Sequence, residues 1–87
     1  MDDVAKIAAR LSEAQRMIVE ASEPGGFDDP DQACGCDIKG AGQHAAAKAL
    51  ERKGVGEVEH YDNINTLYWN NALGLAVRTY LMETNNG

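Results

Sequence analysis

The spacing of the apolar residues changes twice along this chain, and no other feature constrains its fold as strongly. Up to Gly54 they recur every three or four positions, which is the period of a helix with one buried face. Residues 57–69 mostly alternate between polar and apolar, as in a β-strand, and the helical spacing returns near Asn71. The pattern predicts a mostly helical α+β domain with one β-hairpin before its last helix.

The N-terminal helical region carries a helix-start signal within it. Its apolar stripe consists of Val4, Ile7, Leu11, Ala14, Ile18 and Ala21. Ser12, followed three residues later by Gln15, is typical of a capping box, in which each side chain bonds the other residue's backbone amide. We therefore expect either two helices that meet near Leu11–Ser12 or one helix that bends there. Pro24 and the glycines after it end this region, because proline cannot continue the helical hydrogen bonds.

A second helix is predicted over Ala41–Lys53. Its expected buried side consists of Ala41, Ala45, Ala46, Ala49 and Leu50. His44, Lys48 and Arg52 are spaced by four and are expected on the opposite side. Gly54 stands where a left-handed residue commonly ends a helix, and the apolar residue after it is expected to pack back on the helix.

The segments on either side of this helix have weaker patterns. Asp29-Pro30 suits an N-cap followed by proline in the first turn, which predicts a short helix over Pro30–Cys36. After Gly56, residues 57–61 and 66–69 are expected to pair as antiparallel strands around a segment rich in turn-forming residues.

The second strand of the hairpin and the helix after it are expected to contribute the C-terminal part of the core. Leu67 and Trp69 share one strand face and are expected to cover the core, which leaves Tyr68 partly exposed. Asn70 or Asn71 is expected to cap the closing helix. The apolar face of that helix is expected to contain Leu73, Ala76, Val77, Tyr80 and Leu81.

Three strings resemble the winged helix-turn-helix family of small bacterial and phage proteins. Residues 11–16 (LSEAQR) are similar to the capped opening of the first helix in that family. Residues 49–55 (ALERKGV) resemble the end of its recognition helix, and residues 68–76 (YWNNALGLA) resemble its last strand and closing helix. The resemblance covers roughly residues 11–81.

The resemblance implies one winged-helix-like domain over residues 1–87, with three or four helices and a two-stranded β-hairpin wing. Extra helical turns are expected over residues 2–10 and a frayed tail over residues 83–87. The hairpin departs from the usual pattern of DNA-binding members, which carry arginine or lysine there. In its place this chain has Glu57, Glu59 and Asp62.

The leading functional hypothesis is a small, non-enzymatic DNA-binding regulator of the phage or mobile-element type. By resemblance, its recognition residues would be Gln43, His44, Lys48 and Arg52. Lysine and arginine would contact phosphate or guanine edges, and glutamine would pair with adenine. Residues 39–53 also hold four of the chain's eight lysines and arginines. The plainer interpretation of these bases is a solvated helix face.

The net charge of −6 favours a different hypothesis. An acidic inhibitor, similar to phage anti-defence and anti-CRISPR proteins, would block a basic surface of its protein partner. Asp28, Asp29 and Asp31 are the candidate interaction residues for this role, and a solvated loop is their plainer interpretation. A structural or assembly adaptor is a third alternative.

Catalytic and metal chemistry are not indicated by the sequence. Zinc-ligand residue types occur at Cys34, Cys36, His44 and His60, but Cys-x-Cys differs from the usual two-residue zinc knuckle. Asp37 beside Cys36 should raise the pKa of the thiol, which is opposite to what a nucleophile needs. We expect no catalytic residues, no bound metal and no cofactor.

The expected partner is therefore DNA or a basic protein. A domain of 87 residues is only marginally stable alone, which favours a homodimer. No apolar run approaches the roughly 20 residues that span a bilayer, so no membrane partner is expected. The acidic first residues lack a signal-peptide pattern and the paired cysteines suit a reducing compartment, so the expected location is the cytoplasm.

Overall fold

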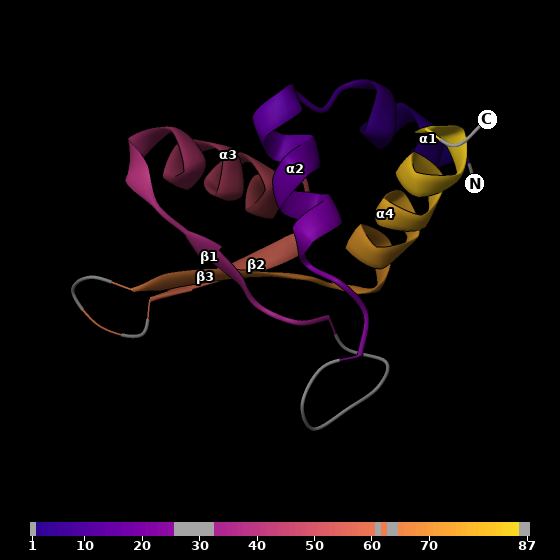
Figure 1. The fold of residues 1–87 in the computed structure, drawn as a ribbon. Helices are drawn as coiled ribbons and strands as arrows, with labels where there is room; N and C mark the ends of the chain where they lie inside the picture. The colour runs from indigo at the N-terminus through magenta and orange to yellow at the C-terminus, as the bar shows by residue number, and fades with distance from the viewer. Residues whose placement is uncertain (1, 26–32, 61, 63–64, 86–87) are drawn as a thin grey trace.

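The computed structural model describes residues 2–25, 33–60, 62 and 65–85. Within them the fold is α+β and mostly helical, with four helices and a three-stranded antiparallel sheet in the order β1-β3-β2. The elements are α1 (Asp2–Ala9), α2 (Glu13–Ala21), β1 (Cys36–Ile38), α3 (Gly40–Arg52), β2 (Gly56–His60), β3 (Thr66–Asn70) and α4 (Ala72–Asn85). Figure 1 shows the helices on one side of the sheet, and α1 packs beside α4.

The N-terminal region forms two helices, and local signals end and begin them as predicted. The Ser12 hydroxyl accepts a hydrogen bond from the Gln15 amide at 3.2 Å, and the Gln15 side chain accepts one from the Ser12 amide at 3.0 Å. This is the predicted capping box, and it starts α2. Ala8 and Leu11 at the junction are buried, so the break between the helices is packed into the core.

Helix α3 also ends as its sequence predicts. Gly54 has a φ of 80°, in the left-handed region that glycine adopts without strain. The Gly54 amide donates to the Glu51 carbonyl and the Val55 amide donates to the Leu50 carbonyl, which together make a Schellman motif. Val55 and Leu50 are both fully buried and belong to the main core cluster.

The buried side of α3 differs from the prediction. Ala46 and Leu50 are buried as expected, and so is Ala47, whereas Ala41 and Ala45 are exposed. The cause is that alanine supplies most of the apolar residues of this helix, so its sequence contrasts only weakly between faces. The side that contacts α2 and the sheet is decided by packing with those elements.

The predicted helix over Pro30–Cys36 is wrong for the part that the structure describes. Ala33 forms an isolated bridge with Pro24, and Cys36 begins strand β1, which pairs with β3. The sheet therefore has a third strand that the sequence did not indicate. Residues 30–32 lie outside the described part of the chain.

The hairpin is confirmed, but the predicted buried face of its second strand is wrong. Strand β2 pairs with β3 in a register that places Val58 opposite Tyr68. Tyr68 is fully buried, while Leu67 and Trp69 are half-exposed on the other face. Burial, followed by the charge of Cys36, raises the pKa of Tyr68, so its phenol stays protonated and can donate a hydrogen bond. Tyr61 lies outside the described residues.

Asn70 and Asn71 have separate tasks at the start of α4. Asn71 is the cap, since its side-chain oxygen accepts from the Gly74 amide at 3.0 Å. Asn70 is the last residue of β3, is 4% exposed and joins the sheet to α2 through its amide.

The predicted fraying from Glu83 is wrong as far as Asn85, because α4 continues to that residue. On the predicted apolar face of α4, Val77 and Leu81 are buried, whereas Ala76 and Tyr80 are exposed.

Candidate nucleic-acid interface

One face of α3 is exposed along its whole length. Ala41, Ala45, Lys48 and Arg52 follow one another at spacings of four, three and four, and all four are exposed. The first half of this stripe therefore has small side chains and the second half has two cations one turn apart. At about 1.5 Å per residue, the helix is about 20 Å long. We call these four residues the α3 stripe.

The cations of the stripe have no acidic partner within the described residues. Neither Lys48 nor Arg52 forms an ion pair there. Glu51 is the acid of α3, and its carboxylate accepts a hydrogen bond from the Val58 amide of β2 at 3.0 Å. This bond holds the carboxylate at the sheet edge. It also gives the Val58 amide a hydrogen-bond acceptor, which an amide on the open side of an edge strand would otherwise lack. The positive charge of Lys48 and Arg52 therefore faces solvent.

Gln43 lies near the start of α3, and its side chain bonds the backbone of the residue that precedes the helix. Its side-chain oxygen accepts a hydrogen bond from the Lys39 amide at 2.7 Å. The side-chain NH2 group is the part of Gln43 that can contact a partner as a donor. Gln43 is exposed and lies beside the stripe residues in the sequence.

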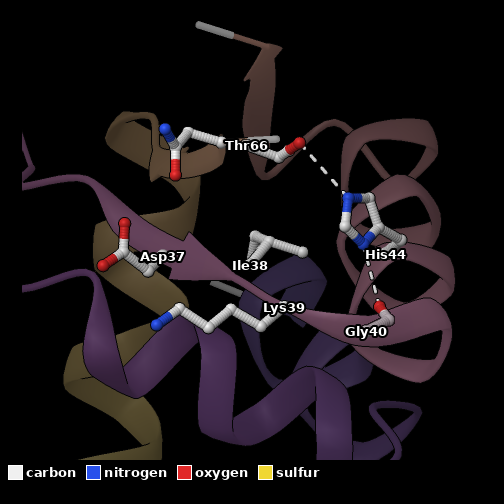
Figure 2. A pocket seen from close by; sticks show the side chains of 7 residues that line it. Asp37, Ile38, Lys39, Gly40, His44 and Thr66 are labelled. Carbon is white, nitrogen blue, oxygen red and sulfur yellow. Dashed lines mark hydrogen bonds between the residues drawn. The ribbon is translucent and has the colours of Figure 1, made fainter. Parts of the chain in front are cut away.

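His44 does not lie on the exposed side with Lys48, contrary to the prediction. Figure 2 shows its imidazole between the Gly40 carbonyl and the Thr66 hydroxyl, at the edge of a pocket of about 370 Å³. Nδ1 is 2.8 Å from the Gly40 oxygen, and Nε2 is 3.2 Å from Thr66 Oγ1. The side chain is half-buried and fastens the first turn of α3 to β3.

A second histidine completes this group of hydrogen bonds. His60, the last residue of β2, places Nδ1 2.9 Å from the same Thr66 hydroxyl. The Gly40 oxygen can only accept, so Nδ1 of His44 donates to it. The Thr66 hydroxyl lies between Nε2 of His44 and Nδ1 of His60 and is within hydrogen-bond distance of both. Sequence spacing gave no signal for this group, because its members come from α3, β2 and β3.

The acids of the hairpin lie away from the stripe. Glu57 and Glu59 are exposed and alternate with Val58, which packs against the core on the helix side of the sheet. Because successive side chains of a strand point to opposite faces, the two carboxylates lie on the face that the helices leave uncovered. The sheet therefore separates them from Lys48 and Arg52. Asp28, Asp29 and Asp31 lie outside the described residues.

The candidate zinc ligands do not come together in the structure. The Cys34 thiol donates to the Gly25 carbonyl at 3.3 Å, whereas His44 and His60 meet at Thr66. Among the described residues, no group of three or more histidine, cysteine, aspartate or glutamate side chains is placed to hold a metal ion. Neither cysteine forms a disulfide.

The two thiols are expected to differ in reactivity. Burial, followed by the charge of Asp37, raises the pKa of Cys36, as the sequence predicted for the effect of Asp37. At mildly alkaline pH a smaller fraction of Cys36 should therefore be thiolate in the folded protein than in the unfolded chain. Iodoacetamide should modify Cys36 several-fold more slowly than the exposed Cys34 in the folded protein. Mass spectrometry of digested samples over time measures both rates. Comparable rates in the folded protein would contradict this, and the unfolded chain serves as the control.

Comparisons with protein-family models, curated proteins and solved structures found no match to this chain. In the part of the chain that the structure describes, none of the helices has both the length and the apolar character of a membrane-spanning segment.

Proposed function

We propose that this protein is a non-enzymatic DNA-binding protein that places the exposed face of α3 against the duplex. The observation that carries the proposal is the α3 stripe, in which Lys48 and Arg52 are exposed one turn apart and beside small residues. Ala41 and Ala45 leave the helix backbone free to approach a surface closely. Such a helix, about 10–12 Å wide with its side chains, fits the major groove of B-DNA.

The two cations of the α3 stripe and their neighbours Gln43 and His44 have different expected roles at the duplex. Lys48 carries a compact ammonium group that suits a phosphate, and Arg52 carries a planar guanidinium that suits a phosphate or a guanine edge. Gln43 contributes its NH2 group as a donor, because its oxygen is bonded to Lys39. His44 has a positioning role, since its ring nitrogens are bonded to Gly40 and Thr66.

A winged-helix-like arrangement is part of the same proposal. The order of α3, β2, β3 and α4 supports it, because a hairpin follows the candidate recognition helix directly. The element immediately before α3 in the sequence is strand β1, and the helix that packs against α3 is α2, which comes earlier in the chain. In this arrangement the acidic hairpin does not contact DNA, and α3 carries the interaction.

Neutralising the two stripe cations tests the proposal. The double variant Lys48→Gln/Arg52→Gln should bind a random-sequence duplex at least about tenfold more weakly at low salt, because two phosphate contacts are lost. Its plot of log affinity against log salt should be shallower by about 2. Fluorescence anisotropy of a labelled duplex measures both quantities.

The matched control is Lys6→Gln/Arg10→Gln, which removes the same charge from exposed positions in and after α1. This control should keep affinity for the duplex within about twofold, since screening confines exposed charges to about 10 Å at ordinary salt. Equal weakening by the two double variants would show a response to net charge alone and would overturn the proposal. So would a wild-type protein that binds no duplex at low salt.

A further inference from the structure

The sheet has a second exposed face, which the proposed DNA interaction does not use. The register places Glu57 opposite Trp69, and it places Leu67 opposite Glu59 on one side and Asp37 on the other. These five residues share the face turned away from the helices, because the other face contains the buried Thr66, Tyr68 and Asn70. We call this group the outer sheet face.

The outer sheet face combines apolar surface with negative charge. Leu67 and Trp69 are half-exposed, and Asp37, Glu57 and Glu59 are exposed. The three strands contain three carboxylates and no lysine or arginine. Cross-strand neighbours on one face have Cβ atoms about 5 Å apart, so each glutamate lies directly beside an apolar side chain.

Neighbouring parts of the chain define which section of this face is available. Gly35 lies against it, since a Cβ atom there would be 3.1 Å from both Leu67 Cδ1 and Trp69 Nε1. Lys39 lines the same pocket as Asp37, so a cation lies near that end of the face. The carboxylates farthest from Lys39 across the sheet are Glu57 and Glu59 on β2, an edge strand.

We infer that the outer sheet face binds a basic, extended segment of a protein partner with arginines at alternate positions. Glu57 and Glu59 are two residues apart on one strand, which spaces their carboxylates about 7 Å apart. Alternate side chains of an extended peptide have the same spacing. Each arginine then pairs with one carboxylate in the two-bond geometry that guanidinium favours, and its stem covers Leu67 or Trp69.

Arginine is preferred over lysine at this face because of Trp69. A planar guanidinium stacks on an aromatic ring while its edge bonds a carboxylate, and the Trp69–Glu57 pair offers both groups side by side. DNA is not the occupant, since three carboxylates repel its phosphates. The molecule thus has a cationic helix face for DNA and an anionic sheet face for a protein.

The test uses the full chain and a short labelled peptide that alternates arginine with serine. The double variant Glu57→Gln/Glu59→Gln should bind this peptide about tenfold more weakly than the wild-type protein, because two charge-assisted pairs are lost. The matched control Glu13→Gln/Glu83→Gln removes the same charge from exposed positions on α2 and α4 and should change the affinity less than about twofold. Circular dichroism confirms that both variants fold.

Trp69 supplies an independent readout, since it is the single tryptophan of the chain. Its fluorescence emission should change as the arginine peptide saturates the protein, and the lysine version of the peptide should bind more weakly. Lys48→Gln/Arg52→Gln should keep its peptide affinity within about twofold, so a failure of the DNA proposal leaves this result unaffected. The inference is overturned by an absence of peptide binding at low salt. It is also overturned if Glu13→Gln/Glu83→Gln loses as much peptide affinity as Glu57→Gln/Glu59→Gln, or if the peptide binds without a change in Trp69 emission.

Discussion

Replacing Asn70 with leucine should lower the free energy of unfolding by about 4 kcal/mol, among the largest effects of any single substitution in this chain. The Asn70 side chain donates to the Val19 and Ser22 carbonyls, both at 2.9 Å, and accepts from the Tyr68 hydroxyl at 2.9 Å. Leucine has a similar volume but no polar atoms. The substitution therefore leaves three polar groups without their partner in a part of the core that has little access to water.

The neighbouring asparagine provides the matched control. Asn71→Ala removes an amide of the same type, which caps α4 and donates to the Gly54 carbonyl at 2.8 Å. Asn71 is exposed, so water replaces these bonds and the expected cost is about 1 kcal/mol. Urea denaturation followed by circular dichroism measures both variants. A loss below about 1.5 kcal/mol for Asn70→Leu would contradict the role of Asn70 as the junction between the sheet and α2.

The elements that the sequence predicted correctly are those with signals in a few adjacent residues. Ser12 with Gln15, Gly54, and Asn71 each satisfy backbone groups at a helix end, and the local sequence determines those bonds. The hairpin was also predictable, because alternation over residues 57–69 needs no knowledge of distant partners.

The features that were missed depend on contacts between distant residues. Strand β1 has three residues, too few to display a period, and it is a strand because β3 offers a free edge for pairing. The alternation of side chains along a strand indicates which residues of β3 share a face, but it does not indicate which of the two faces is buried. The less apolar face, with Thr66, Tyr68 and Asn70, is inside. Asn70 donates across the core to the Val19 and Ser22 carbonyls, and the Tyr68 hydroxyl donates to Asn70.

The candidate site was predictable to a similar degree. The exposure of Lys48 and Arg52 follows from their charge and spacing. The placement of His44 does not, because its imidazole turns toward Thr66, which is 22 residues away along the chain. The bond between Glu51 and the amide of Val58 likewise joins two separate elements. From the sequence alone, the Glu51 carboxylate would be expected to offset the positive charge of Lys48 and Arg52.

Gly74→Ala should destabilise the fold by about 3 kcal/mol, although alanine is the better helix former. An added Cβ would collide with the Val55 carbonyl oxygen and would lie 2.7 Å from Asn70 Oδ1. The carbonyl cannot move aside without cost, because it accepts a hydrogen bond from the Asn71 amide at 3.0 Å. Asn70 is held by its own buried bonds. The first turn of α4 must therefore shift away from Val55 and from the end of β3.

The same substitution at Gly42 of α3 separates this steric effect from helix propensity. A Cβ at Gly42 would meet nothing within 4 Å, so Gly42→Ala should raise the free energy of unfolding by about 0.5–1 kcal/mol. Urea denaturation of the two variants should therefore give changes of opposite sign. If Gly74→Ala were neutral or stabilising, α4 would not be packed directly on the Val55 carbonyl. The close approach that joins α4 to the start of β2, and so fixes the hairpin beside α3, would then be wrong.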